Sequence, residues 1–150
     1  MSSPLDCVVL QADIDSVQSW CKVHGMELNA SKCKTISFSR TPSHSVYKLN
    51  GNSLEKVALI KDLDVLFNIK LKFNCHVSTV VSKAFATLGF LRRNVSEFND
   101  PYVLKSLCCC LIRSTLEYAV LIWAPHNATQ RNQIERVQKR FLRFSLRNLQ

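Results

Sequence analysis

The sequence is poor in the residues that interrupt regular structure and lacks several patterns on which catalytic sites are built. Only three glycines and four prolines occur among 150 residues, and 47% of the residues are hydrophobic. Such a composition argues against disorder and suits one domain or two small subdomains with a modest core. There is no glycine-rich phosphate-binding loop, and no apolar run reaches the length of a membrane span. We therefore expect a folded protein without a membrane segment.

The seven cysteines do not form a disulfide pattern. Their number is odd, and Cys108, Cys109 and Cys110 are consecutive, so on a helix they point in three directions. The first residues also lack the basic-then-apolar pattern of a secretory signal. We interpret the cysteines as reduced, largely buried thiols of an intracellular protein, either cytoplasmic or nuclear.

Carboxylates are not clustered in the way that metal-dependent catalysis requires. The close acidic pairs are Asp13 with Asp15, on the polar face of an expected helix, and Asp62 with Asp64, at an expected strand edge or turn. Two-metal polymerases and nucleases need a larger set of converging ligands. Both pairs are therefore interpreted as solvated surface groups.

Cysteine and histidine give no stronger indication of a site. Cys21 and His24 lie three residues apart, with Cys33 downstream, but there is no CxxC pair and no second half of a zinc site. A buried thiol beside a surface imidazole is the favoured interpretation. The other histidines are scattered, so no cysteine nucleophile has a predicted partner. The sequence thus predicts no catalytic site that is complete by itself.

The first half of the chain combines a helix with short strands. Leu10, Ile14, Val17 and Cys21 recur at helical spacing and predict a helix over about 5–24. A small antiparallel sheet is expected next, with turn residues at 50–52. Its predicted strands are Thr35–Ser39, Val46–Leu49, Val57–Ile60 and Leu63–Phe67.

Helical periodicity dominates the second half. Apolar residues recur over 77–91 and predict an amphipathic helix that ends near Asn94. Asp100 and Pro101 suit the N-cap and first turn of a second helix, which continues to about Leu116. That helix is apolar on most sides, so we expect it at the centre of a bundle.

A last helix is expected after Pro125, with Asn127 or Thr129 as its N-cap. Its predicted apolar face consists of Ile134, Val137, Phe141 and Phe144. Trp20 and Trp123 are expected in or near the core. The fold class is therefore α+β: an N-terminal helix and small antiparallel sheet, followed by a mainly helical bundle, with the change near residues 70–76.

Positive charge is concentrated in the second half. The net charge is +9, with nine Lys/Arg against seven Asp/Glu in residues 1–74 and eleven against four in residues 75–150. The segment of the last helix contains one acidic residue, Glu135, and six basic residues: Arg131, Arg136, Lys139, Arg140, Arg143 and Arg147. Such a field attracts polyanions, nucleic acid first and anionic membrane second. A solvated helix face is the alternative.

Six stretches in register along the chain form a pattern that is more specific than any one of them. They read LQADIDSVQSWC, LNASKCKTISFSR, YKLNG with LEKVALIKDLDVLF, LKFNCHVSTVVSKAFATLGFLRR, LIRSTLEYAVLIWAP and IERVQKRFLR. Together, from about residue 5 to residue 147, they resemble the reverse transcriptase of jockey-like non-LTR retrotransposons.

The resemblance implies a division of the chain into functional regions. Residues 1–73 are similar to the C-terminal part of a palm, and residues 74–150 to a helical thumb and post-thumb region. The family's catalytic Ala-Asp-Asp segment lies upstream of the first helix and is absent, so we expect no polymerase activity from this chain alone. Mg²⁺ is implied for the complete family enzyme and no cofactor for this part. The implied partners are RNA or DNA, bound weakly through the backbone, and the upstream reverse transcriptase segments.

Nine basic residues are candidates for contact with nucleic acid. By resemblance, Lys32 and Lys34 face the incoming nucleotide or the template, and Lys61 lies in the IKDLDVLF hairpin beside the primer terminus. Arg92 and Arg93 lie on a thumb helix near the nucleic-acid backbone. The charge of the last helix adds Arg136, Lys139, Arg140 and Arg143. A solvated side chain is the alternative at every position.

Two positions in the IKDLDVLF region depart from the family pattern. Asp64 stands where glycine is usual, and Asn68 stands where aspartate is frequent. If position 64 requires a positive φ, aspartate tolerates it better than most residues, although at some cost. An acidic group there would also repel a primer phosphate. The departures fit a decayed copy or a fragment no longer held to polymerase function.

Three functional interpretations remain open at this point. The first is a reverse transcriptase fragment that is inactive alone and binds RNA or DNA weakly and nonspecifically. The second is a helical protein-interaction module without a nucleic-acid function. The third is an active enzyme whose aspartates come from a partner chain or from an upstream part of the gene.

Overall fold

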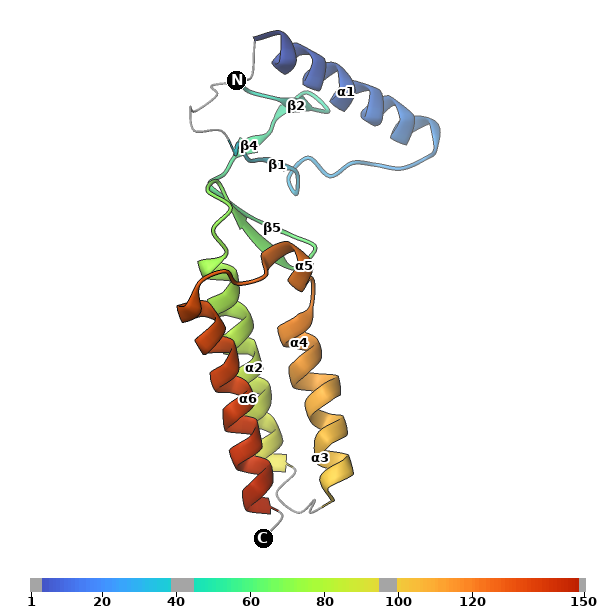
Figure 1. Cartoon of the computed structure of the whole chain (residues 1–150). Helices are drawn as coiled ribbons and strands as arrows, with labels where there is room; N and C mark the ends of the chain where they lie inside the picture. The colour runs from blue at the N-terminus through green and yellow to red at the C-terminus, as the bar shows by residue number, and fades with distance from the viewer. Residues whose placement is uncertain (1–3, 39–44, 95–99, 149–150) are drawn as a thin grey trace. The chain divides into compact units, whose positions relative to one another are not determined.

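The chain forms two units, Met1–Lys72 and Phe73–Gln150. The structure is a computed structural model that describes residues 4–38, 45–94 and 100–148. Within these ranges, the first unit holds helix α1 (Pro4–Val23) and six short strands, and the second unit is helical (Figure 1). The predicted α+β class, with an N-terminal helix and a helical C-terminal part, is confirmed. The assignment of residues 1–73 to a palm and 74–150 to a thumb remains a prediction.

The strands of the first unit form three separate pairs instead of the single antiparallel meander that the sequence predicted. One pair is parallel and two are antiparallel. They are β1 (Lys34–Thr35) with β4 (Glu55–Lys56), β2 (Lys48–Leu49) with β3 (Asn52–Ser53), and β5 (Leu59–Asp62) with β6 (Val65–Asn68). The predicted strand Thr35–Ser39 shrinks to β1, because its pairing with β4 ends at Thr35; Ser39 lies outside the described residues.

Two tight turns set the register of the antiparallel pairs. Asn50 and Gly51 have φ values of 52° and 77°, and Leu49 pairs with Asn52, as in the twisted two-residue hairpins that the predicted turn at 50–52 favours. The predicted strands Val57–Ile60 and Leu63–Phe67 leave residues 61–62 for the second turn, but it lies two residues later, at 63–64. Asp64 has a φ of 67°, so the site does impose the left-handed conformation that glycine usually supplies.

Helix α1 forms as predicted, but its apolar side is not buried. Cys21 is enclosed, whereas Trp20 is 56% exposed, so the prediction of a core position for Trp20 is wrong. The reason is that α1 meets the β2–β3 hairpin through glutamine side chains. Gln11 exchanges two hydrogen bonds of 2.9 Å with the backbone of Lys48, and Gln18 accepts one of 2.9 Å from the backbone of Asn50.

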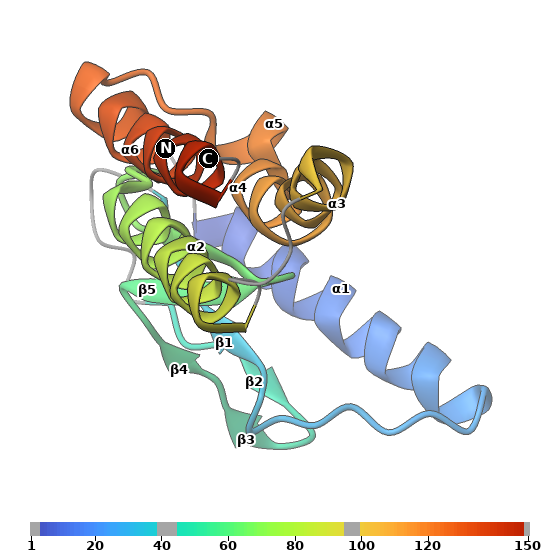
Figure 2. The ribbon, with the colours of Figure 1, turned by 90° about the horizontal axis from the view of Figure 1, so that it is seen from below.

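The second unit is a helical bundle with the core of the protein's described part. Its members are α2 (Asn74–Asn94), α3 (Pro101–Leu107), the π-helix η1 (Cys108–Arg113), α4 (Ser114–Glu117), α5 (Val120–Trp123) and α6 (Ala128–Asn148). The core consists of Val80, Ala84, Leu88, Leu91, Leu104, Ile112, Leu116, Val137 and Phe141. Figure 2 shows α2, α6 and the α3–α4 segment end on. The apolar faces predicted for α2 and α6 are the faces that pack.

The central helix is α2, and not the cysteine-rich helix that was expected there. Helix α2 packs against α6 on one side and against η1 and α4 on another. By contrast, Cys109, Cys110 and Leu111 of η1 are exposed. The apolar composition of this helix therefore overstated its burial, because the thiols of Cys109 and Cys110 face solvent.

Side-chain caps define the helix starts as the sequence predicted. The carboxylate of Asp100 accepts a hydrogen bond of 2.8 Å from the Tyr102 amide, with Pro101 in the first turn. Asn127 is the cap of α6, since its side-chain oxygen accepts a 3.0 Å bond from the Thr129 amide. Trp123 is 1% exposed, as predicted for a core residue, and its indole N–H donates to the Tyr118 carbonyl.

The cysteines are thiols, as predicted, but they are not largely buried. All seven lie in the described part of the chain and none is bonded in a disulfide. Only Cys21 is buried, whereas Cys75, Cys109 and Cys110 are exposed. Burial raises the pKa of the half-buried Cys108 thiol, and its neighbour Cys109 raises it further, against an opposing effect of Arg113.

We predict that hydrogen exchange will protect residues 76–147 more strongly than residues 30–73. The helices share a buried core, whereas the strand pairs are two to four residues long. Exchange monitored peptide by peptide in the whole chain provides the measurement. Stronger protection of the strands than of α2 and α6 would contradict it.

We also predict that iodoacetamide will alkylate Cys108 more slowly than Cys109 at neutral pH. A raised pKa leaves less thiolate on Cys108, and the thiolate is the nucleophile. Mass spectrometry of a short labelling pulse separates the two sites, with exposed Cys110 as the reference. The difference should shrink in denaturant, where burial is lost, and equal rates in the folded chain would exclude this account.

Candidate nucleic-acid interface

A basic cleft lies between α2 and α6 in the second unit. Its volume is about 490 Å³, and its lining residues are Phe85, Arg92, Arg136, Lys139, Arg140, Arg143 and Phe144. Five of the nine basic residues predicted as nucleic-acid contacts thus line one cleft. The other four are elsewhere in the described residues.

The spacing of the basic residues along α6 explains why they line one cleft. Residues three or four apart share a helix face, which brings Arg136, Arg140 and Arg143 together with Lys139 on one flank. The neighbouring flank carries Val137 and the other apolar residues that pack on α2. The same contact therefore places the basic flank of α6 beside Arg92 of α2.

Two phenylalanines belong to the cleft and were assigned by sequence reasoning to the apolar faces alone. Phe85 and Phe144 pack against the core with part of each ring. The Arg140 guanidinium carbon lies 5.7 Å from the centroid of the Phe85 ring, a cation–π distance. Phe144 meets Phe141 edge to face, with centroids 6.3 Å apart. Arg140 four residues before Phe144 was a signal in the sequence that an aromatic ring would border the basic flank.

The cleft carries a strong excess of positive charge. The lining contains five cations and two phenylalanines, without a carboxylate among the described lining residues. Lys139 forms an ion pair of 3.0 Å with Glu135, both exposed, and such pairs contribute little. A concave surface with charges of one sign focuses the field and attracts anions such as phosphate groups.

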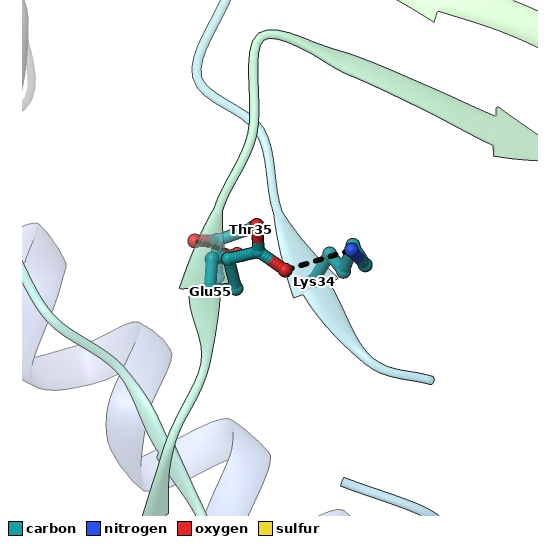
Figure 3. Close-up of polar contacts among 3 residues, drawn as sticks. All are labelled: Lys34, Thr35 and Glu55. Carbon is teal, nitrogen blue, oxygen red and sulfur yellow. Dashed lines mark hydrogen bonds and ion pairs between the residues drawn. The ribbon is translucent and has the colours of Figure 1, made fainter. Parts of the chain in front are cut away.

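Two of the three predicted lysines of the first unit, Lys34 and Lys61, have carboxylate partners. Lys34 binds Glu55 at 2.7 Å across the β1–β4 pair, and Thr35 donates to the Glu55 carbonyl at 3.4 Å (Figure 3). Lys61 binds Asp64 at 2.5 Å across the second turn. These exposed pairs contribute little by themselves, and neither lysine lines the cleft, so neither adds to its concentrated positive charge.

The two remaining candidates are exposed and do not line the cleft. Lys32 lies in the turn before β1. Arg93 follows Arg92 in the last turn of α2, and successive helical residues point about 100° apart, so only Arg92 faces the cleft.

The residues that are present do not fit the Mg²⁺ of the complete family enzyme. In the ranges 4–38, 45–94 and 100–148, no three His, Cys, Asp or Glu side chains lie close enough to hold a metal ion. Asp13, Asp15, Asp62 and Asp64 are exposed, as expected of solvated groups.

None of the described helices has the length and apolarity needed to cross a bilayer.

Two curated relatives are RNA-directed DNA polymerases from the mobile element jockey. The protein of Drosophila melanogaster is 33% identical over 79 residues, which are 52% of this chain and 8% of the relative. The protein of Drosophila funebris is 26% identical over 89% of this chain and 15% of the relative. No protein-family model and no solved structure matches. The relationship to jockey-like reverse transcriptases that the six stretches predicted is confirmed, and the chain spans a small part of these relatives' length.

Proposed function

Starting from the relationship to jockey-like reverse transcriptases, we propose that this chain binds RNA or DNA through the phosphate backbone and does not catalyse polymerisation alone. The observation that supports binding most directly is the cleft between α2 and α6. It joins Arg92 of one helix to the basic flank of the other. Such a site suits a part of a reverse transcriptase that holds the template or primer.

The physics of the cleft favours weak and nonspecific binding. The cations lie on the exposed surface of helices, so they approach phosphates without much desolvation and compete with salt. Contacts to phosphates fix position along a strand but carry no direct information about base sequence. Binding should therefore depend steeply on salt and little on sequence.

The proposal that the chain does not catalyse polymerisation alone rests on the arrangement of its acidic side chains. The acidic residues that the structure describes are not arranged to hold metal ions, so the polymerase chemistry of the relatives belongs, in this proposal, to residues outside this chain. The first unit then corresponds to the late palm and the second unit to the thumb. The order of the six stretches and the division near residue 72 support this assignment.

A protein-interaction module is the second candidate, and an apolar groove favours it. The groove has a volume of about 470 Å³ and runs between the α3–η1–α4 segment and α6. Its apolar lining includes Leu104, Cys108, Ile112, Leu116, Phe141 and Leu142. A module that docks only to proteins has no reason to bind RNA, so a salt titration with RNA separates the two candidates.

We predict that replacing Arg136, Lys139, Arg140 and Arg143 by Gln will weaken RNA binding and flatten its salt dependence. Each neutralised phosphate contributes a slope of roughly −0.7 to −0.9 in log affinity against log salt. The slope should therefore decrease in magnitude by up to roughly 3 if all four side chains contact phosphates. Fluorescence anisotropy with labelled RNA over a salt series gives both quantities.

The matched control changes the same net charge outside the cleft. Lys22, Lys48, Lys70 and Lys72, all in the first unit, are replaced together by Gln. This variant should keep most of the wild-type slope. Equal losses in the two variants would show that net charge alone drives binding. An unchanged slope in the cleft variant would remove the cleft from the proposal.

A further inference from the structure

We infer that the basic cleft takes single-stranded nucleic acid, with an unpaired base packed on the guanidinium of Arg140 and phosphates held by the surrounding cations. This inference rests on the proposed function and names the class of ligand for the same site. It depends on the aromatic part of the cleft, which backbone binding by itself does not use.

Arg140 and Phe85 together form a stacking platform. Phe85 comes from α2 and packs partly on the core, so its ring is held in place. Arg140 comes from α6, and its guanidinium carbon lies 5.7 Å from the ring centroid. A guanidinium held within cation–π distance of an aromatic ring loses less freedom when it binds a further flat group. Unpaired bases stack on arginine planes in this way.

The surroundings of the platform suit the rest of a nucleotide. The cleft volume of about 490 Å³ is in the range of small-molecule sites, so it has room for a nucleotide unit. Arg92 approaches from α2, while Arg136 and Arg143 lie one helical turn to either side of Arg140 on α6. Phosphates on both sides of the stacked base can therefore meet a cation. Phe144 adds a second aromatic wall.

A duplex cannot use the platform. Its bases are stacked on one another inside the helix and present only their edges in the grooves. A duplex would therefore gain the electrostatic contribution of the cleft and not the stacking contribution. Stacking of bases on side chains is tolerant of sequence, because every base has a flat face. The preference is thus for unpaired bases and not for a particular base.

The test uses probes of equal charge with and without bases. Oligo(dT) and oligo(U) are compared with an abasic deoxyribose-phosphate strand of the same length, and with a duplex, by fluorescence anisotropy. Strands with bases should bind the whole chain about fivefold more tightly than the abasic strand, the lower end of the stacking range. Comparable gains in affinity for oligo(dT) and oligo(U) over the abasic strand would show that the cleft takes both single-stranded DNA and single-stranded RNA.

Arg140→Lys is the decisive variant, because it keeps the charge and removes the planar group. It should abolish the difference between base-containing and abasic strands, which is read as a ratio of affinities within the variant, so that a change in backbone affinity common to both strands cancels. Arg131→Lys is the matched control. Arg131 is exposed on the same helix and does not line the cleft, so this variant should keep the difference.

The outcomes separate this inference from the proposed function. Equal binding of base-containing and abasic strands by the wild type would overturn the inference and leave backbone binding intact. A difference that survives in Arg140→Lys would overturn the assignment to Arg140. Failure of every probe to bind would overturn both the inference and the proposed function. Helical circular dichroism of each variant confirms that the comparison is made between folded chains.

Discussion

The packing of α2 against α6 is the interaction on which the basic cleft depends. Ala84 on α2 and Val137 on α6 are fully excluded from solvent within the same core. Burial of each Val, Leu, Ile or Phe side chain in this core contributes about 1.5–3 kcal/mol, which exceeds the few tenths of a kcal/mol by which exposed like charges on neighbouring helix positions repel. The core can therefore hold Arg92 of α2 next to the basic flank of α6. The cleft is a by-product of that packing, and it concentrates charge that the sequence spreads over two distant segments.

Local periodicity made the second unit predictable, and the reasons are visible in particular residues. The repeats on α2 and α6, the cap at Asp100 and the cap at Asn127 each need only a few neighbouring residues to define them. The basic flank of α6 could also be predicted from the spacing of its residues. The position of this flank beside Arg92 and Phe85 could not be predicted, because sequence spacing does not reveal which flanks of two helices come together.

The errors in the first unit have a different cause. The parallel pairing of Lys34 with Glu55 joins segments that no local pattern links. The sequence therefore did not show which strand would pair with the segment predicted to run to Ser39. The turn at Asp64 was displaced by two residues, because its positive φ is a property of backbone pairing and not of composition. Trp20 was expected in or near the core, but α1 meets its neighbouring hairpin through glutamines, and the indole is exposed. The π-helical turn at Cys108–Arg113 has no sequence signal that we recognise.

The central claim is that nucleic acid binds where α2 and α6 meet. Backbone amide shifts of the isotope-labelled chain, followed by NMR during addition of a short single strand, test it most directly. The account predicts that the largest shifts cluster at Arg92 and along 136–144, with small changes around Lys32 and Lys34. Largest shifts in the first unit, or along the groove between η1 and α6 instead of the basic cleft, would contradict it.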